Sequence, residues 1–350
     1  MVTRWWNAVP EAGRAEVLRE AAEFLRSGGI VAFPTETVYG LGGDARSDEA
    51  VARIFRAKGR PSDNPLIVHI ADRSQLDGLV EAVPEPARRL MDVFWPGPLT
   101  LVLPAVKGSV SERVTAGLDT VAVRMPAHPI ALAFLREAGC PVAAPSANRS
   151  GRPSPTTARH VLDDLDGRID GVIDGGPTGV GLESTVAEIT EEGAVRILRP
   201  GGVTRERIRA LGLKVERDET PAASEAPPRS PGLKYAHYAP QGRMEVYVGE
   251  PPDRVLAHMQ RRLDEAASRG ERTAALVFAE HAGRIRADAV LNLGSRSDLG
   301  EAARRLYDRL RECDARGIRF IAAEGVPEEG IGEALMNRLR KAASGRVRRV

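Results

Sequence analysis

The alternation of short apolar runs with helical segments constrains the fold more than any other feature of this sequence. Residues 30–33 are apolar on both faces and lead into a loop bounded by Pro and Gly, which is typical of a buried strand. Similar runs occupy residues 66–70, 99–103, 121–123, 141–144, 171–173, 186–189 and 195–198. Apolar spacing predicts helices over 11–27, 48–57, 84–94, 129–138, 157–165 and 204–211. These elements predict an α/β domain over residues 1–212. Its sheet should be partly antiparallel, because the strands after residue 173 follow one another closely.

A second domain is predicted after a change in composition at Gly212. Residues 216–232 are rich in Pro, Ala, Ser, Glu and Arg without apolar periodicity, so we expect a linker over 213–243. Beyond it, residues 244–350 alternate predicted strands (244–248, 273–278, 289–293, 318–322) with predicted helices (253–268, 298–315, 331–342). This order predicts a small Rossmann-like α/β domain. No G-x-G-x-x-G follows its first strand, so dinucleotide binding there is unsupported.

The overall composition excludes several classes of protein. The chain carries 50 basic and 48 acidic residues, which is too balanced for a surface devoted to wrapping nucleic acid. Its two cysteines, Cys140 and Cys313, cannot build a disulfide framework, a zinc ribbon or an iron–sulfur site. No apolar stretch approaches the roughly 20 residues that cross a bilayer, and no export signal is evident. We therefore expect a cytoplasmic protein with no membrane partner.

Several catalytic motifs are missing from the sequence. No Gly-Lys dipeptide is present, so a Walker A loop is impossible, and neither H-E-x-x-H nor G-x-S-x-G occurs. The six histidines show no metal-ligand spacing. We expect no dedicated metal site in the chain, and we expect any metal to be Mg²⁺ carried by a nucleotide.

Polar residues instead gather where predicted strands begin or end. Lys58 and Arg60 flank Gly59 in a turn before the strand at 66–70, where two cations can clamp a phosphate chain. The same pattern also fits a solvated helix C-terminus, where cations are favoured without any ligand. The residues alone leave both interpretations open.

A second polar segment, residues 144–156, follows the strand at 141–144. Its Ser, Asn and Gly residues would let backbone approach phosphate or ribose closely, although the same residues describe any long turn. Isolated polar residues also stand in or beside apolar runs: Thr35, Thr37, His69, Arg124, Ser184 and Arg199. A buried charge needs a partner, and an arginine at a strand end often finds one in an anionic ligand.

Seven short motifs, in order, resemble the YrdC-like domain of threonylcarbamoyl-AMP synthases. They are residues 33–41 (FPTETVYGL), 58–66 (KGRP with NPL), 95–100 (WPGPLT), 121–126 (VAVRMP), 145–148 (PSAN), 183–186 (ESTV) and 199–201 (RPG). Residues 230–240 (SPGLKYAHYAP), with the α/β unit behind them, are similar to the long two-domain form of the family. The resemblance covers nearly the whole chain and implies a YrdC-like twisted mixed sheet in the first domain.

The resemblance also implies a reaction, in which L-threonine, bicarbonate and ATP give L-threonylcarbamoyladenylate, pyrophosphate and water. A downstream threonylcarbamoyl transferase complex would then modify the tRNA adenosine beside the anticodon. By similarity, Lys58 and Arg60 would act on the phosphates. Threonine or its carbamate would contact Thr37, His69, Arg124, Ala144 and Ser184. ATP would contact Lys58, Arg60, Asn64, Thr120, Ser146, Asn148, Ser154, Arg199 and Tyr235, with Tyr235 making the linker a lid.

Two other functions remain open from the residues. An RNA-binding module of the same fold would need stacking aromatics or a basic face, and the chain has only 15 aromatic residues. The last hundred residues hold 20 basic and 15 acidic residues, which leaves a weak tRNA contact possible. A carbamoyl-transfer enzyme of hydrogenase maturation, where a similar domain occurs, would carry zinc-finger cysteines, which two cysteines cannot supply.

Overall fold

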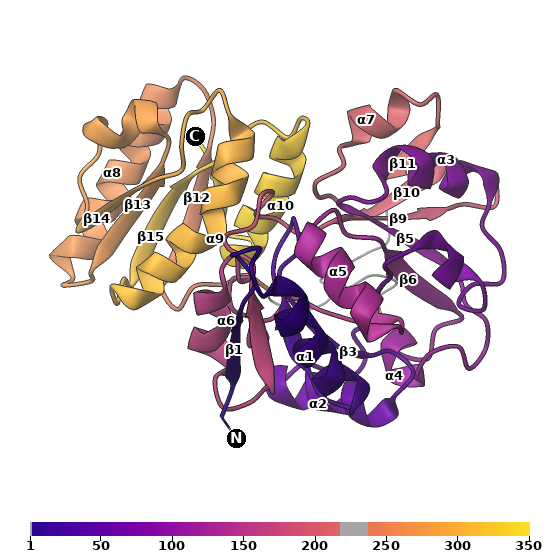
Figure 1. Cartoon of the computed structure of the whole chain (residues 1–350). Coiled ribbons are helices and arrows are strands. Elements are labelled where there is room, and N and C mark those ends of the chain that lie inside the picture. The colour runs from indigo at the N-terminus through magenta and orange to yellow at the C-terminus, as the bar shows by residue number, and fades with distance from the viewer. Residues whose placement is uncertain (1, 218–236) are drawn as a thin grey trace. The chain divides into compact units, whose positions relative to one another are not determined.

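The computed structural model describes residues 2–217 and 237–350, which divide into two compact units (Figure 1). The described residues up to 150, together with 154–179 and 183–217, form the first unit. The second unit comprises 237–350 and also takes in two three-residue segments, 151–153 and 180–182. Each unit has its own sheet, and each is described separately below.

The first unit is built on one mixed sheet, as the sequence predicts. Within the described residues the strand order is β1-β8-β2-β3-β7-β4-β6-β5-β9-β10-β11. The pairs β2–β3, β3–β7, β7–β4, β6–β5 and β9–β10 are antiparallel, and the other neighbours are parallel. The strands are β1 (Arg4–Asn7), β2 (Val31–Phe33), β3 (Gly40–Asp44), β4 (Ile67–His69), β5 (Leu99–Pro104), β6 (Thr120–Arg124), β7 (Val142–Ala143), β8 (Gly171–Asp174), β9 (Thr185–Ile189), β10 (Val195–Arg199) and β11 (Val215–Arg217).

The helices of the first unit fall where apolar spacing predicts them, except α4 (Glu112–Thr115), which is too short to show a helical spacing. They are α1 (Arg14–Arg26), α2 (Asp48–Lys58), α3 (Glu85–Phe94), α4 (Glu112–Thr115), α5 (Pro129–Ala138), α6 (Ala158–Leu165) and α7 (Arg205–Arg209), with a 3₁₀ turn over Arg73–Leu76. Helix α2 shows why such segments begin and end where they do. The Ser47 side chain accepts the Ala50 N–H at its start, and Gly59, at a φ of 61°, ends it in the left-handed conformation. Lys58 is therefore held at the last turn of a well-capped helix.

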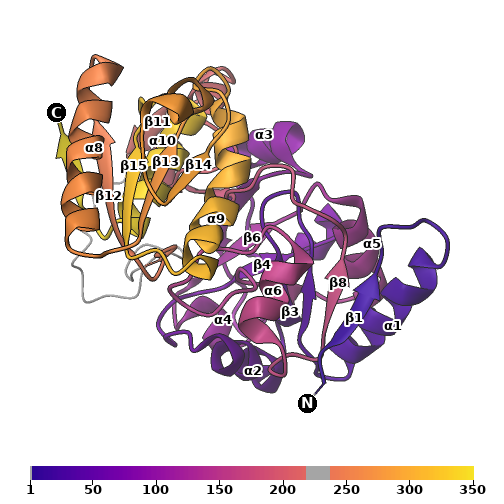
Figure 2. The ribbon, with the colours of Figure 1, turned by 90° about the vertical axis from the view of Figure 1, so that its left-hand side faces the viewer.

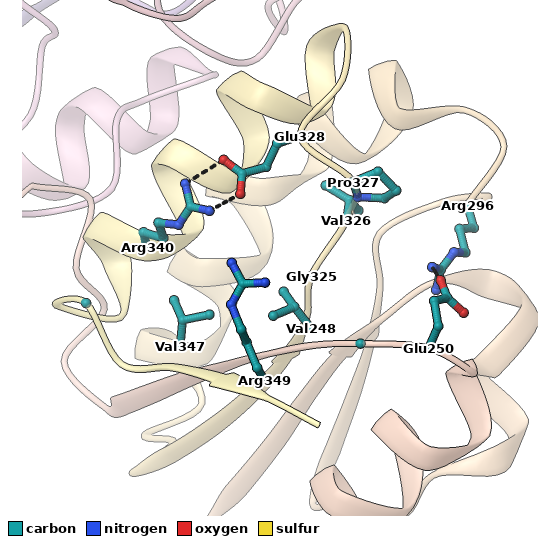
Figure 3. Close-up of a pocket in the computed structure, with 12 residues that line it drawn as sticks. Val248, Glu250, Arg296, Gly325, Val326, Pro327, Glu328, Arg340, Val347 and Arg349 are labelled. Carbon is teal, nitrogen blue, oxygen red and sulfur yellow. Dashed lines mark hydrogen bonds and ion pairs between the residues drawn. The ribbon is translucent and has the colours of Figure 1, made fainter. Parts of the chain in front are cut away.

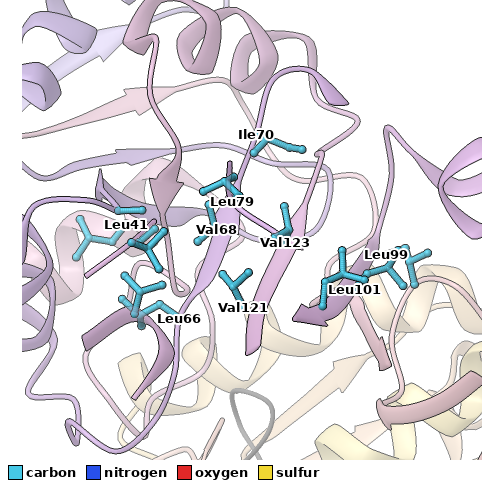
Figure 4. Close-up of a cluster of buried hydrophobic side chains, with 14 of the residues drawn as sticks. Leu41, Leu66, Val68, Ile70, Leu79, Leu99, Leu101, Val121 and Val123 are labelled. Carbon is cyan, nitrogen blue, oxygen red and sulfur yellow. The ribbon is translucent and has the colours of Figure 1, made fainter. Parts of the chain in front are cut away.

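The two faces of the central strands differ in character. Val68, Leu101 and Val123 point to one face, where with Leu41 and Leu66 they belong to the main buried core (Figure 4). On the other face Ile67, Val102 and Ala122 form a smaller apolar cluster with Val186 and Leu198. Because side chains alternate along a strand, His69 and Arg124 belong to this second face. The smaller cluster is thus the floor beside which the polar residues lie.

Strand β3 is a difference from the sequence-based expectation, which treated residues 34–42 as a loop. Its glycines are required by close packing: a Cβ on Gly42 would lie 2.8 Å from Val142 Cγ1 and 2.9 Å from Phe33 Cε1. Glycine has a low strand propensity, so a strand that needs glycine for its packing is not predicted from the sequence pattern. Strand β11 likewise lies in the range expected for the linker, where it pairs with β10.

The second unit is a five-stranded parallel sheet in the order β14-β13-β15-β12-β16, counted over the described residues. Its strands are β12 (Arg243–Val248), β13 (Thr273–Val277), β14 (Ala289–Asn292), β15 (Phe320–Glu324) and β16 (Val347–Arg349). Helix α8 (Pro252–Ser268) covers one face, whereas α9 (Leu299–Ala315) and α10 (Ile331–Ala342) cover the other (Figure 2). A 3₁₀ turn spans Ala279–Arg284. Across the described parts of both units, no helix combines the length and apolar character needed to cross a bilayer.

Candidate active site

The register of the central strands places polar residues at opposite ends of β4 and β6 in the first unit. His69 pairs with Arg124 where both strands end. Thr120 begins β6 four residues earlier, about 13 Å from Arg124 at ~3.3 Å per residue. Because Ile67 pairs with Ala122 in parallel register, the residues just before β4, including Asn64, lie toward the end of the strand pair where Thr120 begins β6. We call these two places the arginine end and the asparagine end.

Arg124 is buried at the arginine end, with only 3% of its surface exposed. Its Nη1 donates to Thr37 Oγ1 at 2.9 Å, and its Nε donates to Gly97 O at 3.3 Å. Its Nη2 lies 2.5 Å from Glu36 Oε1, so the guanidinium already holds a carboxylate. Sequence reasoning missed Glu36, because an acidic residue between two threonines in a loop gives no sign of burial. The signal that could have found it is its position inside a motif that also supplies Thr37.

His69 is 4% exposed and lies beside Arg124. Burial, and then the Arg124 charge, lower the pKa of the His69 imidazole to about 3. Its Nδ1 lies 3.3 Å from Ile67 O, a distance at which the neutral ring can donate to that carbonyl. His69 is therefore a neutral polar group at any physiological pH.

Ser184 and Arg199 complete the arginine end from neighbouring strands. Ser184 Oγ lies 2.8 Å from Thr100 Oγ1, and Arg199 Nη2 donates to Ser184 O at 3.0 Å. The β5–β6 register pairs Leu101 with Val123, so Thr100 lies beside Arg124. A register shift between Ile197 and Arg199 places Arg199 opposite Val186. Thr100 was missed because it stands in an otherwise apolar strand.

Lys58 and Arg60 lie at the asparagine end and join two loops. Lys58 is 3% exposed, and its Nζ donates to the carbonyl oxygens of Ser146 and Asn148. Arg60 donates through Nη2 to Pro65 O at 2.9 Å and through Nε to Asn64 O at 3.2 Å. A solvated helix terminus is thus the wrong description of Lys58, because its charge is buried against backbone carbonyls.

Asn64 is the most unusual residue of this end. It is fully buried, yet neither polar atom of its amide has a hydrogen-bond partner in the described ranges of the chain. A buried amide without partners costs about 1–3 kcal/mol. Such a group indicates a place where a ligand supplies the missing bonds.

The remaining predicted residues fall into three groups. Ser146, Asn148 and Ser154 lie in the loop after β7, where Ser154 Oγ donates to Glu183 Oε1 at 2.5 Å and Asn148 Nδ2 donates to Arg149 O at 2.8 Å. The Ala144 N–H is already used, because it donates to Ile67 O at 2.9 Å. Tyr235 lies outside the described residues, so its role as a lid stays a prediction.

Other groups with possible catalytic chemistry lie elsewhere or are inert. Cys140 and Cys313 are both buried, and burial raises the pKa of each thiol to about 12. Among residues 2–217 and 237–350, no three His, Cys, Asp or Glu side chains gather where they could hold a metal ion. The described polar groups at the two ends are suited to binding and aligning anions.

Comparison with known proteins is consistent with this geometry. Residues 23–201 match the Sua5/YciO/YrdC family model, described as telomere recombination, and residues 203–344 match the model described as the threonylcarbamoyl-AMP synthase C-terminal domain. The threonylcarbamoyl-AMP synthase of Bacillus subtilis is 52% identical over 330 residues, covering 94% of each chain. That of Pyrococcus abyssi is 49% identical over 335 residues, covering 95% of this chain and 96% of its own.

A solved structure agrees over the same length. The crystal structure of P. abyssi Sua5 complexed with L-threonine has a TM-score of 0.91 and 44% sequence identity, and it covers 100% of both chains. Both family models, both relatives and this structure therefore describe the same two-part protein. The chain belongs to the threonylcarbamoyl-AMP synthase family, in its two-domain form.

Proposed function

We propose that this chain is an L-threonylcarbamoyladenylate synthase, which converts L-threonine, bicarbonate and ATP into L-threonylcarbamoyladenylate, pyrophosphate and water. Relatives that match over nearly their whole length bear the name of this activity. The P. abyssi structure with L-threonine bound supports threonine as the amino-acid substrate. The observation that carries the proposal is the separation of a buried arginine from an unsatisfied asparagine along β4 and β6, because it provides two subsites in one sheet.

The arginine end is suited to an amino-acid carboxylate. Arg124 presents a guanidinium whose Nε and Nη1 are fixed by Gly97 and Thr37, while Nη2 is paired with Glu36. A substrate carboxylate would replace Glu36 there, since a guanidinium edge can donate hydrogen bonds to both oxygens of a carboxylate. Neutral His69 and the Ser184–Thr100 hydroxyl pair would line the remainder of this subsite without adding charge.

The asparagine end is suited to the nucleotide. Asn64 would gain hydrogen bonds from the ligand, and Thr120, Ser146, Asn148 and Ser154 would add polar contacts around it. Lys58 and Arg60 bring two fixed positive charges to this end, each held by backbone carbonyls. Charges already held in position stabilise a developing negative charge without reorganisation. Arg199, which the resemblance assigns to ATP, donates to Ser184 O and so lies toward the arginine end.

The proposed chemistry needs alignment rather than a protein nucleophile. The threonine amine attacks bicarbonate and water leaves, which gives a carbamate. A carbamate oxygen then attacks the α-phosphorus of ATP, the bond to the bridging oxygen breaks, and pyrophosphate departs. Holding three reactants in line removes much of the entropic part of the barrier. With a pKa of about 3, His69 would be a poor proton acceptor, so we assign it to positioning.

We expect Mg²⁺ to enter on the ATP phosphates, where it would neutralise charge. The product would pass to a threonylcarbamoyl transferase that modifies tRNA, and a weak tRNA contact by the second unit remains part of the proposal. Each of these partners follows from the family's reaction rather than from a contact in the structure.

The test is pyrophosphate release by the purified full chain with ATP, bicarbonate and magnesium. Release should require added threonine, and Lys58→Ala or Arg60→Ala should nearly abolish it. Arg56→Ala is the matched control, because Arg56 is an exposed cation one half-turn earlier on α2. Release without threonine, or full activity in both test variants, would contradict the proposal.

A further inference from the structure

The second unit holds a pocket of about 700 Å³ that the reaction above does not use. It lies at the carboxyl ends of β12 and β15 and beside β16, and Val248, Val347, Gly325 and Pro327 line it (Figure 3). Pockets that bind small organic molecules in proteins span about 300–1,000 Å³. The pocket is therefore large enough for a molecule of nucleotide size.

The topology of the sheet explains why a pocket opens at this place. From β12 the chain passes through α8 toward β13, whereas from β15 it passes through α10 in the opposite direction to β16. Right-handed crossovers put these two helices on opposite faces, so the loops after the adjacent strands β12 and β15 separate. Open parallel sheets bind ligands at such a point, at the carboxyl ends of the strands.

Three arginines line this pocket, with Arg340 and Arg349 on one side of it and Arg296 on the other (Figure 3). Glu250 and Glu328 line it as well, and Arg296 and Arg340 are each paired with a carboxylate. Figure 3 shows the Arg349 guanidinium reaching into the space between Val347 and Val248. No carboxylate in the described ranges pairs with Arg349, so its charge is available to an anion.

Arg296 is fixed in place before any ligand arrives. Its Nη1 lies 2.7 Å from Glu324 Oε1, and its Nη2 lies 3.0 Å from Glu250 Oε1. Glu324 is 1% exposed and also accepts from His281 Nδ1 at 2.9 Å. A buried carboxylate with two partners holds the guanidinium at the pocket wall, which lowers the entropy lost on binding.

Arg340 can exchange its partner. Both of its terminal nitrogens contact Glu328, but the two side chains are 38% and 45% exposed. Exposed ion pairs contribute little, and a phosphate dianion is a stronger partner for a guanidinium fork than a solvated carboxylate. An anion would therefore replace Glu328 as the partner of Arg340.

We propose that this pocket is a binding site for an organic phosphate of nucleotide size. The phosphate would lie between Arg340 and Arg349, and the organic part would lie on Val248, Val326, Pro327 and Val347, toward Arg296. An inorganic anion would use the arginines but leave most of the volume and the apolar surface empty. The site lies wholly in the second unit, so it does not depend on the proposed reaction.

Hydrogen exchange of the full-length chain, read peptide by peptide, tests the proposal with AMP as the probe. AMP should slow exchange in peptides covering 325–328 and 345–350. Arg349→Ala should raise the AMP concentration for half-maximal protection by roughly tenfold, since each hydrogen bond to a charged group contributes that order of affinity. Glu328→Gln should lower it, because the competing carboxylate is removed.

The adjacent arginine supplies the matched control. Arg348 precedes Arg349 on β16, so its side chain points to the opposite face, where it lies 3.6 Å from Glu245. Arg348→Ala makes the same change in net charge and should leave the half-maximal concentration within about twofold. Peptides covering 58–65 report nucleotide binding at the asparagine end in the same experiment, so failure of one site is distinguished from failure of the other.

Three results would overturn the proposal. The first is an absence of protection of 325–328 and 345–350 at millimolar AMP or ribose 5-phosphate. The second is an equal effect of Arg349→Ala and Arg348→Ala. The third is protection by orthophosphate with the same half-maximal concentration as AMP, because the organic part would then contribute nothing.

Discussion

Replacing Arg124 with lysine should impair the proposed threonine subsite while leaving the proposed ATP subsite intact. The change keeps the positive charge but removes the planar fork, so one nitrogen replaces the separate nitrogens that reach Thr37, Gly97 and the substrate carboxylate. Losing one hydrogen bond to a charged group costs about 1.5–3 kcal/mol. The expected result is a fall in kcat/KM for threonine of about 10- to 150-fold.

The ATP parameters should behave differently, because Thr120 and Asn64 lie at the other end of the strands, about 13 Å away along β6. At saturating threonine, the KM for ATP should change by less than about threefold. Pyrophosphate release is measured against each substrate in turn.

The matched control for this prediction is Arg53→Lys. Arg53 is a partly buried arginine on α2 whose Nη2 lies 2.8 Å from Asp170 Oδ2. The Arg53→Lys change should leave the KM for threonine and the KM for ATP unchanged. A fall in kcat/KM for threonine of less than about threefold, or an equal rise in the KM for ATP, would refute the reasoning.

Three further predictions follow from individual contacts. Two of them, for His69 and Gly42, concern the stability of the first unit, whose unfolding can be followed by tryptophan fluorescence because all three tryptophans lie in that unit. Glu36→Gln should lower the KM for threonine several-fold, because the substrate carboxylate no longer has to displace a buried ion pair; a raised KM would contradict the exchange of carboxylates. The folded-state pKa of His69, about 3, lies below its unfolded value of 6.5, so its stabilising contribution is present above pH 6.5 and lost as the pH falls toward 3. Between pH 7 and pH 5 the wild type should therefore lose about 2 kcal/mol more than His69→Gln in urea titrations, and equal losses would show that the ring is not buried as a neutral group. Gly42→Ala should destabilise the first unit by about 1–3 kcal/mol through overpacking, whereas Gly179→Ala, whose nearest neighbouring atom would be 4.0 Å away, should have little effect; equal destabilisation would argue against the close packing of β3.

The sequence predicts the fold well where apolar runs are long and uninterrupted. Strands β4, β5 and β6 and helix α3 follow directly from hydrophobic spacing, because a strand buried on both faces is apolar at every position. Strand β3 cannot be predicted in this way, because Gly42 is required by close packing and glycine has a low strand propensity. Strand β1, with its single buried tryptophan, Trp6, is too short and too exposed to give an apolar pattern.

The site is less predictable than the fold, because its chemistry depends on register. Arg124 and His69 can be singled out as polar residues at strand ends, but their pairing needs the parallel alignment of β4 with β6. Glu36 and Thr100 have no distinguishing sequence pattern, and they become important only because of what lies beside them. The burial of Lys58 against carbonyls 88 and 90 residues away could not be read from its helix.

The central claim concerns a product that carries atoms from all three substrates. Incubating the full chain with ATP, L-threonine, magnesium and ¹³C-bicarbonate, and analysing the products at once by mass spectrometry, tests it most directly. The account predicts an adenylate that contains threonine and one ¹³C atom and forms in step with pyrophosphate. Pyrophosphate release accompanied by an adenylate of threonine that lacks the ¹³C atom, or by AMP alone from the earliest time points, would contradict it.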